Sequence, residues 1–158
     1  MHSNILLTIL ISLIAFIPIG SCNTIYDDPE IVSLSPGDRL PEFSILCNDG
    51  EVLTTEMLRG KKSVIVFFDT SCPDCQKALP EIQKAYDEDM SRQPDGVRYI
   101  CISRNEDAES VNKYWSDHSY TLPYSAQTSA DVYNLFENIG IPRIYISNSA
   151  LIIEKVYE

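Results

Sequence analysis

The stretch of residues 63–88 reads "SVIVFFDTSCPDCQKALPEIQKAYDE". Its first part, 63–69, is a near-continuous apolar run, which is typical of a strand buried on both faces. From residue 73 to about 91 the apolar residues recur at helical spacing. Cys72 and Cys75 therefore lie where a buried strand passes into a helix. Such a pair can cycle between thiol and disulfide, hold a metal or form a structural bridge.

Strands and helices alternate along the rest of the chain, which predicts an α/β sheet with right-handed crossovers. Short extended runs separated by an Asp-Gly turn predict an N-terminal β-hairpin. The expected elements are the hairpin strands 42–46 and 51–55, a buried strand at 97–103, a helix at 106–118, a loop or short extended piece at 119–125, a helix at 129–140, and strands at 142–147 and 151–157.

The N-terminal segment has the composition of an export signal. Residues 5–19, "ILLTILISLIAFIPI", are aliphatic and uncharged, with the length of a signal-peptide core rather than a comfortable membrane span. The sequence "IGSC" that follows resembles the bacterial lipoprotein box, although no Lys or Arg precedes the apolar core. The resemblance implies a signal peptide at 1–21 and a lipid on Cys22. A plain cleaved signal and a retained transmembrane anchor are the alternatives, and all three place the remaining chain outside the cytoplasm.

The chain that remains is acidic and has the length of one domain. Its formal net charge is −11 at pH 7, and the signal segment contains no Asp, Glu, Lys or Arg. Nucleic-acid binding and adsorption to anionic lipid both need a basic face, so this charge argues against both partners. We expect residues 22–36 to form a lipidated acidic tether and residues 37–158 to form the folded domain.

Two further features give the cysteine pair a family context. Pro80 follows the second cysteine by five positions, and "GIP" at 140–142 precedes the last two strands. With the hairpin and the strand before the cysteines, they resemble the thioredoxin fold, and in particular the membrane-tethered, extracytoplasmic thiol-disulfide oxidoreductases of the TlpA/ResA type. The likeness runs from about Gly37 to Tyr157. It implies a central mixed sheet flanked by helices. The family's fold usually closes with a helix after the final strand, and none is evident in this sequence, so we expect one sheet face to be less covered or to be covered by a partner.

The cysteine positions predict separate roles in thiol-disulfide exchange. Cys72 falls at the N-cap and Pro73 at the first helical position, where its missing N–H costs nothing. The helix N-terminus stabilises a thiolate, so we expect Cys72 to be the nucleophile. Cys75, one turn inward on the apolar face, is expected to resolve the mixed disulfide. The redox-active disulfide between the two sulfurs then needs no metal and no organic cofactor.

The resemblance also assigns a role to the segment far along the chain. It implies that Pro142 is cis and that its loop packs against the cysteines, which excludes metal from the two thiols. It further implies that the backbone of Ile141 pairs with bound polypeptide, while Pro142 shapes the groove that receives it. Both residues are therefore candidate substrate-binding residues.

Charged neighbours are expected to tune the redox potential. Asp74 lies between the two cysteines, and its negative charge is expected to destabilise a thiolate on Cys72 and so to raise the pKa of that thiol. Because oxidants of this fold depend on a very stable thiolate, this charge favours a reductant. Arg143 either offsets Asp74 or is an exposed edge charge. Thioredoxin has a buried Asp six residues before its first cysteine, and that position is Val66 here. Asp69 and Glu81 are the nearest acidic candidates for proton transfer, or else ordinary solvated carboxylates.

The remaining cysteines, Cys47 and Cys101, either form a structural disulfide, which an oxidising compartment permits, or stay free and buried.

These features predict an exported, lipid-anchored thiol-disulfide oxidoreductase of the cell envelope. We expect it to reduce cysteine pairs of exported proteins, with electrons supplied by a membrane thiol-reductant donor. A peroxiredoxin-like peroxide reductase is an alternative, but its Pro-x-x-x-Thr-x-x-Cys pattern would fall on Ile65 and Asp69. A copper-delivery protein would want a C-x-x-x-C spacing. A non-enzymatic surface lipoprotein with the same fold is the third alternative.

Overall fold

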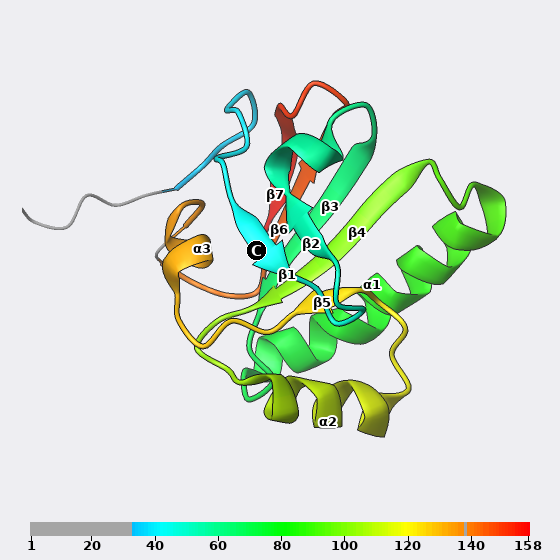
Figure 1. Ribbon diagram of the computed structural model, residues 1–158, viewed down its shortest axis with the longest axis vertical. Helices are drawn as coiled ribbons and strands as arrows, with labels where there is room; N and C mark the ends of the chain where they lie inside the picture. The colour runs from blue at the N-terminus through cyan, green and yellow to red at the C-terminus, as the bar shows by residue number, and fades with distance from the viewer. Residues whose placement is uncertain (1–32, 138) are drawn as a thin grey trace, which may run out of the picture.

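A computed structural model describes residues 33–137 and 139–158 (Figure 1). The predicted signal peptide at 1–21, the lipidation site Cys22 and most of the predicted tether lie outside the described residues. Within the part of the chain that is described, no helix has the length and apolar character needed to cross a membrane.

A mixed sheet of five strands forms the centre of the domain, in the order β5-β4-β3-β6-β7. The central strand β3 (Lys62–Phe68) is parallel to β4 (Val97–Ser103) and antiparallel to β6 (Arg143–Ser147). The short strand β5 (Tyr124–Ser125) extends the sheet beside β4, and β7 (Ile153–Tyr157) extends it beside β6. The predicted thioredoxin-like arrangement of a central mixed sheet is thus confirmed.

Successive side chains of β3 alternate between two hydrophobic clusters on opposite sheet faces. Val64, Val66 and Phe68 belong to the cluster that also contains buried residues of α1 (Pro73–Arg92) and α2 (Ala108–His118). Pro80 lies within α1 without ending it. The two helices therefore cover one face of the sheet.

The other face is covered by the N-terminal hairpin and the segment around α3 (Figure 1). The hairpin consists of β1 (Ser44–Leu46) and β2 (Val52–Thr54), with a short 3-10 helix, η1 (Thr55–Leu58), after it. The predicted Asp-Gly turn is present, and Gly50 adopts a φ of +86° that favours glycine. The hairpin prediction is therefore confirmed.

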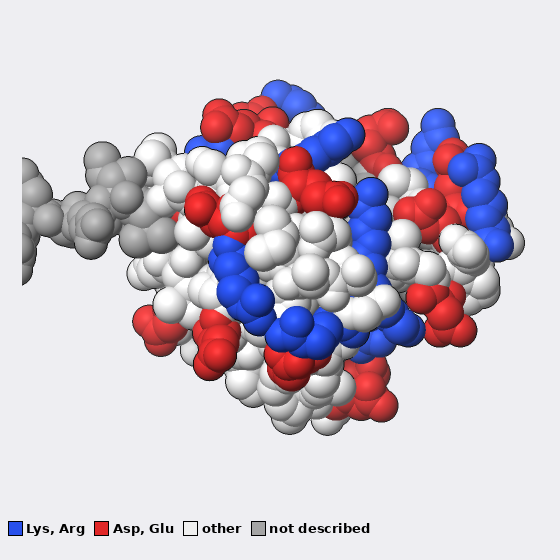
Figure 2. All heavy atoms as spheres, turned by 90° about the horizontal axis from the view of Figure 1, so that it is seen from above, with Lys and Arg blue, Asp and Glu red and all other residues white. Residues whose placement is uncertain are grey.

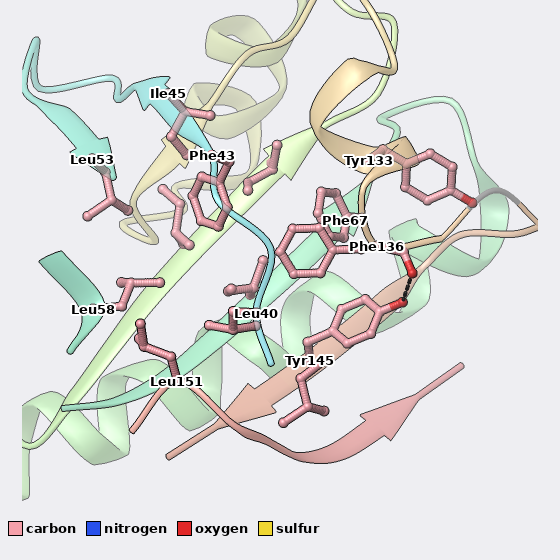
Figure 3. Close-up of a cluster of buried hydrophobic side chains, with 14 of the residues drawn as sticks. Leu40, Phe43, Ile45, Leu53, Leu58, Phe67, Tyr133, Phe136, Tyr145 and Leu151 are labelled. Atoms are coloured by element: carbon pink, nitrogen blue, oxygen red, sulfur yellow. Dashed lines mark hydrogen bonds between the residues drawn. The ribbon is translucent and has the colours of Figure 1, made fainter. Parts of the chain in front are cut away.

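An aromatic cluster ties β3 to the segments that precede and follow the Ile141–Pro142 bond (Figure 3). The Phe67 ring centroid lies 4.9 Å from that of Phe136, 5.5 Å from Tyr133 and 6.1 Å from Tyr145. Buried aromatic pairs at such separations add to the free energy gained from burying their surface. The backbone around residues 133–145 is thus packed against the centre of the sheet.

The predicted helix over 129–140 is wrong, because α3 spans only Asp131–Asn134. Glu137 instead forms a β-bridge with Ser33, and the Leu34 N–H donates to the Phe136 carbonyl at 3.0 Å. Extended pairing with the N-terminal segment is incompatible with a helical backbone at the same residues. The local pattern of apolar side chains could not reveal this competing partner.

The last strand also begins later than the predicted residue 151. Leu151 has a φ of +66°, and Ile152 forms an isolated bridge with Arg39 before β7 begins. On the α1 face, an open apolar groove of about 300 Å³ borders the sheet beside β6 and β7. Within the described residues, the helices therefore leave part of this sheet face open.

Surface charges are mixed over the face shown in Figure 2, where acidic and basic side chains are interspersed. Described ion pairs on exposed side chains include Arg59 with Glu56, Lys61 with Asp95, and Lys62 with Glu154. The basic side chains in these pairs have acidic neighbours that offset their charge.

Candidate active site

Cys72 lies at the junction of β3 and α1, where a tight turn directs its side chain to the surface. Its N–H donates to the Asp69 carbonyl at 3.1 Å, and the Asp69 carboxylate accepts hydrogen bonds from the N–H and hydroxyl of Ser71 at 2.7 and 2.6 Å. Cys72 is the N-cap of α1 with extended backbone, φ −76° and ψ 119°, and Pro73 begins the helix. The predicted placement of Cys72 and Pro73 is confirmed.

The two cysteines differ sharply in exposure. Cys72 is partly exposed, whereas Cys75 is 0% exposed on the inner face of α1, and both are free thiols. Burial raises the pKa of Cys75 to about 12, although a hydrogen bond from the Asp69 backbone N–H partly opposes the shift. Cys75 is therefore a protonated, protected thiol at neutral pH. This difference favours the predicted order, with attack by Cys72 and resolution by Cys75.

The loop around Pro142 packs against the cysteines. The Ile141–Pro142 peptide bond is cis, and the Cys72 Sγ–H donates to the Ile141 carbonyl at 3.7 Å. These partners are 69 residues apart in the chain. The expected juxtaposition of the cysteines and the cis-proline loop is thus present, while the role of Ile141 and Pro142 in binding substrate stays a prediction.

An open groove of about 570 Å³ borders the first turn of α1 and the cis-proline loop. Both candidate substrate-binding residues line it. The full lining is Asp74, Lys77, Ala78, Ile139, Gly140, Ile141, Pro142, Arg143 and Glu158. Cys72 does not line the groove itself, but its Sγ contacts the carbonyl of Ile141, which does, so an extended segment lying in the groove would come close to Cys72.

The charges predicted to tune the potential are paired differently from expectation. Lys77, not Arg143, forms the ion pair with Asp74, at 2.9 Å between Nζ and Oδ1. Arg143 is only 7% exposed and pairs with Glu137 and Glu158, so the idea of an exposed edge charge is wrong. Lys77 therefore offsets part of the charge of Asp74. Effects of Pro73, Asp74 and Arg143 on the redox potential stay predictions.

Among the acidic candidates, Asp69 is the one that acts on Cys75 directly. Its backbone N–H bonds to that sulfur, and its carboxylate charge contributes to the raised pKa of Cys75. Glu81 is exposed on α1, and Val66 is buried in the sheet. Asp69 is therefore better placed than Glu81 to influence the protonation of Cys75.

Sequence reasoning missed Glu106, which supports the turn before Cys72. The Glu106 carboxylate accepts hydrogen bonds from the Thr70 N–H at 2.9 Å and from the Thr70 hydroxyl. Burial raises the pKa of Glu106, and these hydrogen bonds partly oppose the shift. The predicted helix at 106–118 begins at Glu106, whereas α2 begins at Ala108, so the sequence contains no indication that the Glu106 carboxylate would reach back to the turn at Thr70. Glu106 thereby holds the segment from which Cys72 projects.

Cys47 and Cys101 are free thiols in separate clusters on opposite faces of the sheet. Cys101 is 0% exposed, and burial raises its pKa. Of the two alternatives, two free and buried thiols are confirmed and the structural disulfide is not formed, because the sheet separates the two side chains.

Comparison with known proteins places this geometry in a family. The Redoxin family profile matches residues 35–155. The thiol-disulfide oxidoreductase ResA of Halalkalibacterium halodurans is 24% identical over 121 residues, which are 77% of this chain and 67% of that protein. The ResA protein of Bacillus subtilis is 23% identical over 116 residues, 73% of this chain and 63% of its own length.

A solved structure shares the fold as well. The solution structure of a candidate protein disulfide isomerase from Bacteroides thetaiotaomicron has a TM-score of 0.73 and 26% identity, covering 78% of this chain and 79% of that one. The matched family region contains β3, both cysteines of the first turn of α1 and the cis-proline loop. The chain therefore belongs to the Redoxin family, with a thioredoxin-like fold.

Proposed function

We propose that this protein is a thiol-disulfide oxidoreductase that reduces cysteine pairs of exported proteins. One observation carries the proposal. Cys72 is the partly exposed N-cap of α1, and its Sγ lies 3.7 Å from the carbonyl oxygen of Ile141. Cys75 is fully buried in the first turn of the same helix. An accessible sulfur beside a groove, with a protected second sulfur, is the arrangement that sequential exchange with a polypeptide disulfide requires.

The exchange proceeds in two displacements. The Cys72 thiolate attacks one substrate sulfur, and the other substrate sulfur leaves and takes up a proton. The Cys75 thiol then loses its proton and attacks the Cys72 sulfur, which releases the substrate sulfur that Cys72 had attacked, and this sulfur takes up a proton. Two electrons pass to the substrate, and Cys72 and Cys75 end joined in a disulfide. The two sulfurs carry all the electrons, so no metal or organic cofactor takes part.

Regeneration needs an external dithiol that returns two electrons to the Cys72–Cys75 disulfide. We assign this role to a membrane thiol-reductant donor. The export signal predicted at 1–21, the lipidation predicted at Cys22 and the predicted acidic tether support placing the domain on the outer side of a membrane in the cell envelope. Asp74 supports the reducing direction, and its ion pair with Lys77 limits its contribution.

Insulin disulfide reduction tests this function. With dithiothreitol as the electron source, the full chain in detergent should accelerate the reduction well above the uncatalysed rate. The Cys72→Ser variant should return it to that background, because serine cannot form the mixed disulfide. Cys47→Ser is the matched control, since that buried thiol lies on the other face of the sheet and should leave the rate within about twofold. Equal rates for wild type and Cys72→Ser would rule out the proposal.

A further inference from the structure

The loop that faces Cys72 is held by side chains that do not touch either active sulfur. The Tyr133 hydroxyl donates to the Gly140 carbonyl at 2.8 Å. One oxygen of the Glu137 carboxylate accepts the Ile139 N–H at 3.0 Å. The next carbonyl along, that of Ile141, is the acceptor for Cys72. Side chains therefore hold the backbone at the two residues directly before Ile141, whose carbonyl contacts the nucleophile.

A buried ion pair spans the same loop. Glu137 is 1% exposed and lies before the loop, while Arg143 is 7% exposed and follows Pro142 directly. The second oxygen of Glu137 lies 3.3 Å from a terminal nitrogen of Arg143. Removing two charges from water is costly, and good mutual geometry is needed to offset that cost. The pair consequently fixes the two ends of the loop relative to each other.

The same carboxylate reaches the N-terminal segment. The Ser33 hydroxyl donates to Glu137 at 2.9 Å, across a separation of 104 residues. The backbones of these residues also form a β-bridge. Glu137 is thus also anchored to a segment that does not line the groove, so its position does not depend on the loop alone.

We propose that Tyr133, Glu137 and Arg143 are positioning residues for polypeptide substrates, and we call these three residues the loop clamp. The clamp holds the Ile141 carbonyl and the adjoining groove wall where an extended substrate pairs with them. This inference rests on the proposed function, and it adds a selectivity for polypeptide disulfides over small disulfides. A polypeptide needs both the groove and the nucleophile, whereas a small aromatic disulfide needs only the Cys72 thiolate. Loosening the clamp should therefore impair polypeptide exchange alone.

The test compares two substrates with the full chain in detergent: insulin, and the small disulfide dithiobis(nitrobenzoate). In Tyr133→Phe, Glu137→Gln and Arg143→Met, kcat/KM for insulin should fall on the order of 10-fold to 100-fold, mostly through a higher KM. The rate with dithiobis(nitrobenzoate) should stay within about twofold of wild type. Tyr133→Phe keeps the ring that packs on Phe67 and removes only the hydroxyl, so it decides the question if the ion-pair variants fail to fold.

Tyr99→Phe is the matched control. It removes a different partly buried hydrogen bond, from the Tyr99 hydroxyl to Asp89 at 2.7 Å, and should leave both activities unchanged. An equal loss on both substrates, or an unchanged insulin KM in folded Tyr133→Phe, would overturn the loop clamp while the proposed function stands. A wild-type chain that reduces neither substrate would instead overturn the proposed function, and the clamp with it.

Discussion

Iodoacetamide is expected to alkylate Cys72 at least about 100 times faster than Cys75 at pH 7. Alkylation requires a thiolate that the reagent can reach. Cys75 is 0% exposed, and its pKa is raised to about 12 by burial. Only about one Cys75 thiol in 10⁵ is then ionised at pH 7. Cys72 projects from the N-terminus of α1 and is partly exposed.

Peptide mass mapping after brief alkylation measures both rates in one sample. Cys47 and Cys101 are buried free thiols and serve as internal controls that should remain unmodified. Labelling of Cys75 should increase by about tenfold per pH unit above pH 7, because the thiolate fraction rises toward the pKa. Comparable labelling of Cys72 and Cys75 at neutral pH would show that the assignment of nucleophile and resolving thiol is wrong.

The same raised pKa has a consequence for stability. In the unfolded chain Cys75 ionises near the ordinary value of 9.0, whereas in the folded chain it stays protonated up to about 12. Rising pH in this interval therefore favours the unfolded state, and the contribution of Cys75 to the free energy of unfolding is lost progressively from pH 9 upward.

Replacing Phe67 by alanine is expected to lower the free energy of unfolding by about 3–5 kcal/mol. The ring is 0% exposed and lies at the centre of the aromatic cluster, against Tyr133, Phe136 and Tyr145. Alanine would leave a cavity between β3 and the segments on either side of the cis-proline loop. Urea denaturation of wild type and variant measures the difference.

Met57→Ala is the control for this loss. Met57 is 57% exposed, so its truncation should change the free energy of unfolding by no more than about 0.5 kcal/mol. A Phe67→Ala variant as stable as Met57→Ala would mean that the aromatic cluster does not hold β3 and β6 together as described.

Local sequence patterns correctly predicted those parts of the fold that depend on residues close together in the chain. The apolar run of β3 and the helical spacing of α1 placed Cys72 at the N-cap without knowledge of any distant partner. The spacing of Asp74 and Lys77 is likewise that of an ion pair within one helical turn, a signal that could have identified the partner of Asp74. In these cases the decisive interaction lies within a few residues.

The predictions that failed depend on contacts between distant segments. Apolar spacing around residues 129–140 favours a helix, but Glu137 pairs with Ser33, which lies 104 residues away. Arg143 was expected near Asp74 or in solvent, yet its ion-pair partner Glu137 is itself buried. The residues around Arg143 contain no local signal for such a pairing, because the packing of the whole domain determines which residues become partners.

The most direct measurement of the central claim is capture of the mixed disulfide. The Cys75→Ser variant, incubated with insulin and analysed by mass spectrometry without reduction, should carry an insulin chain on Cys72, because the resolving thiol is gone. Cys72→Ser should carry none, since Cys75 is buried. We predict an adduct through Cys72 in the first variant only. An adduct through Cys75, or no adduct under conditions in which the wild-type chain reduces insulin, would contradict exchange at this pair as described.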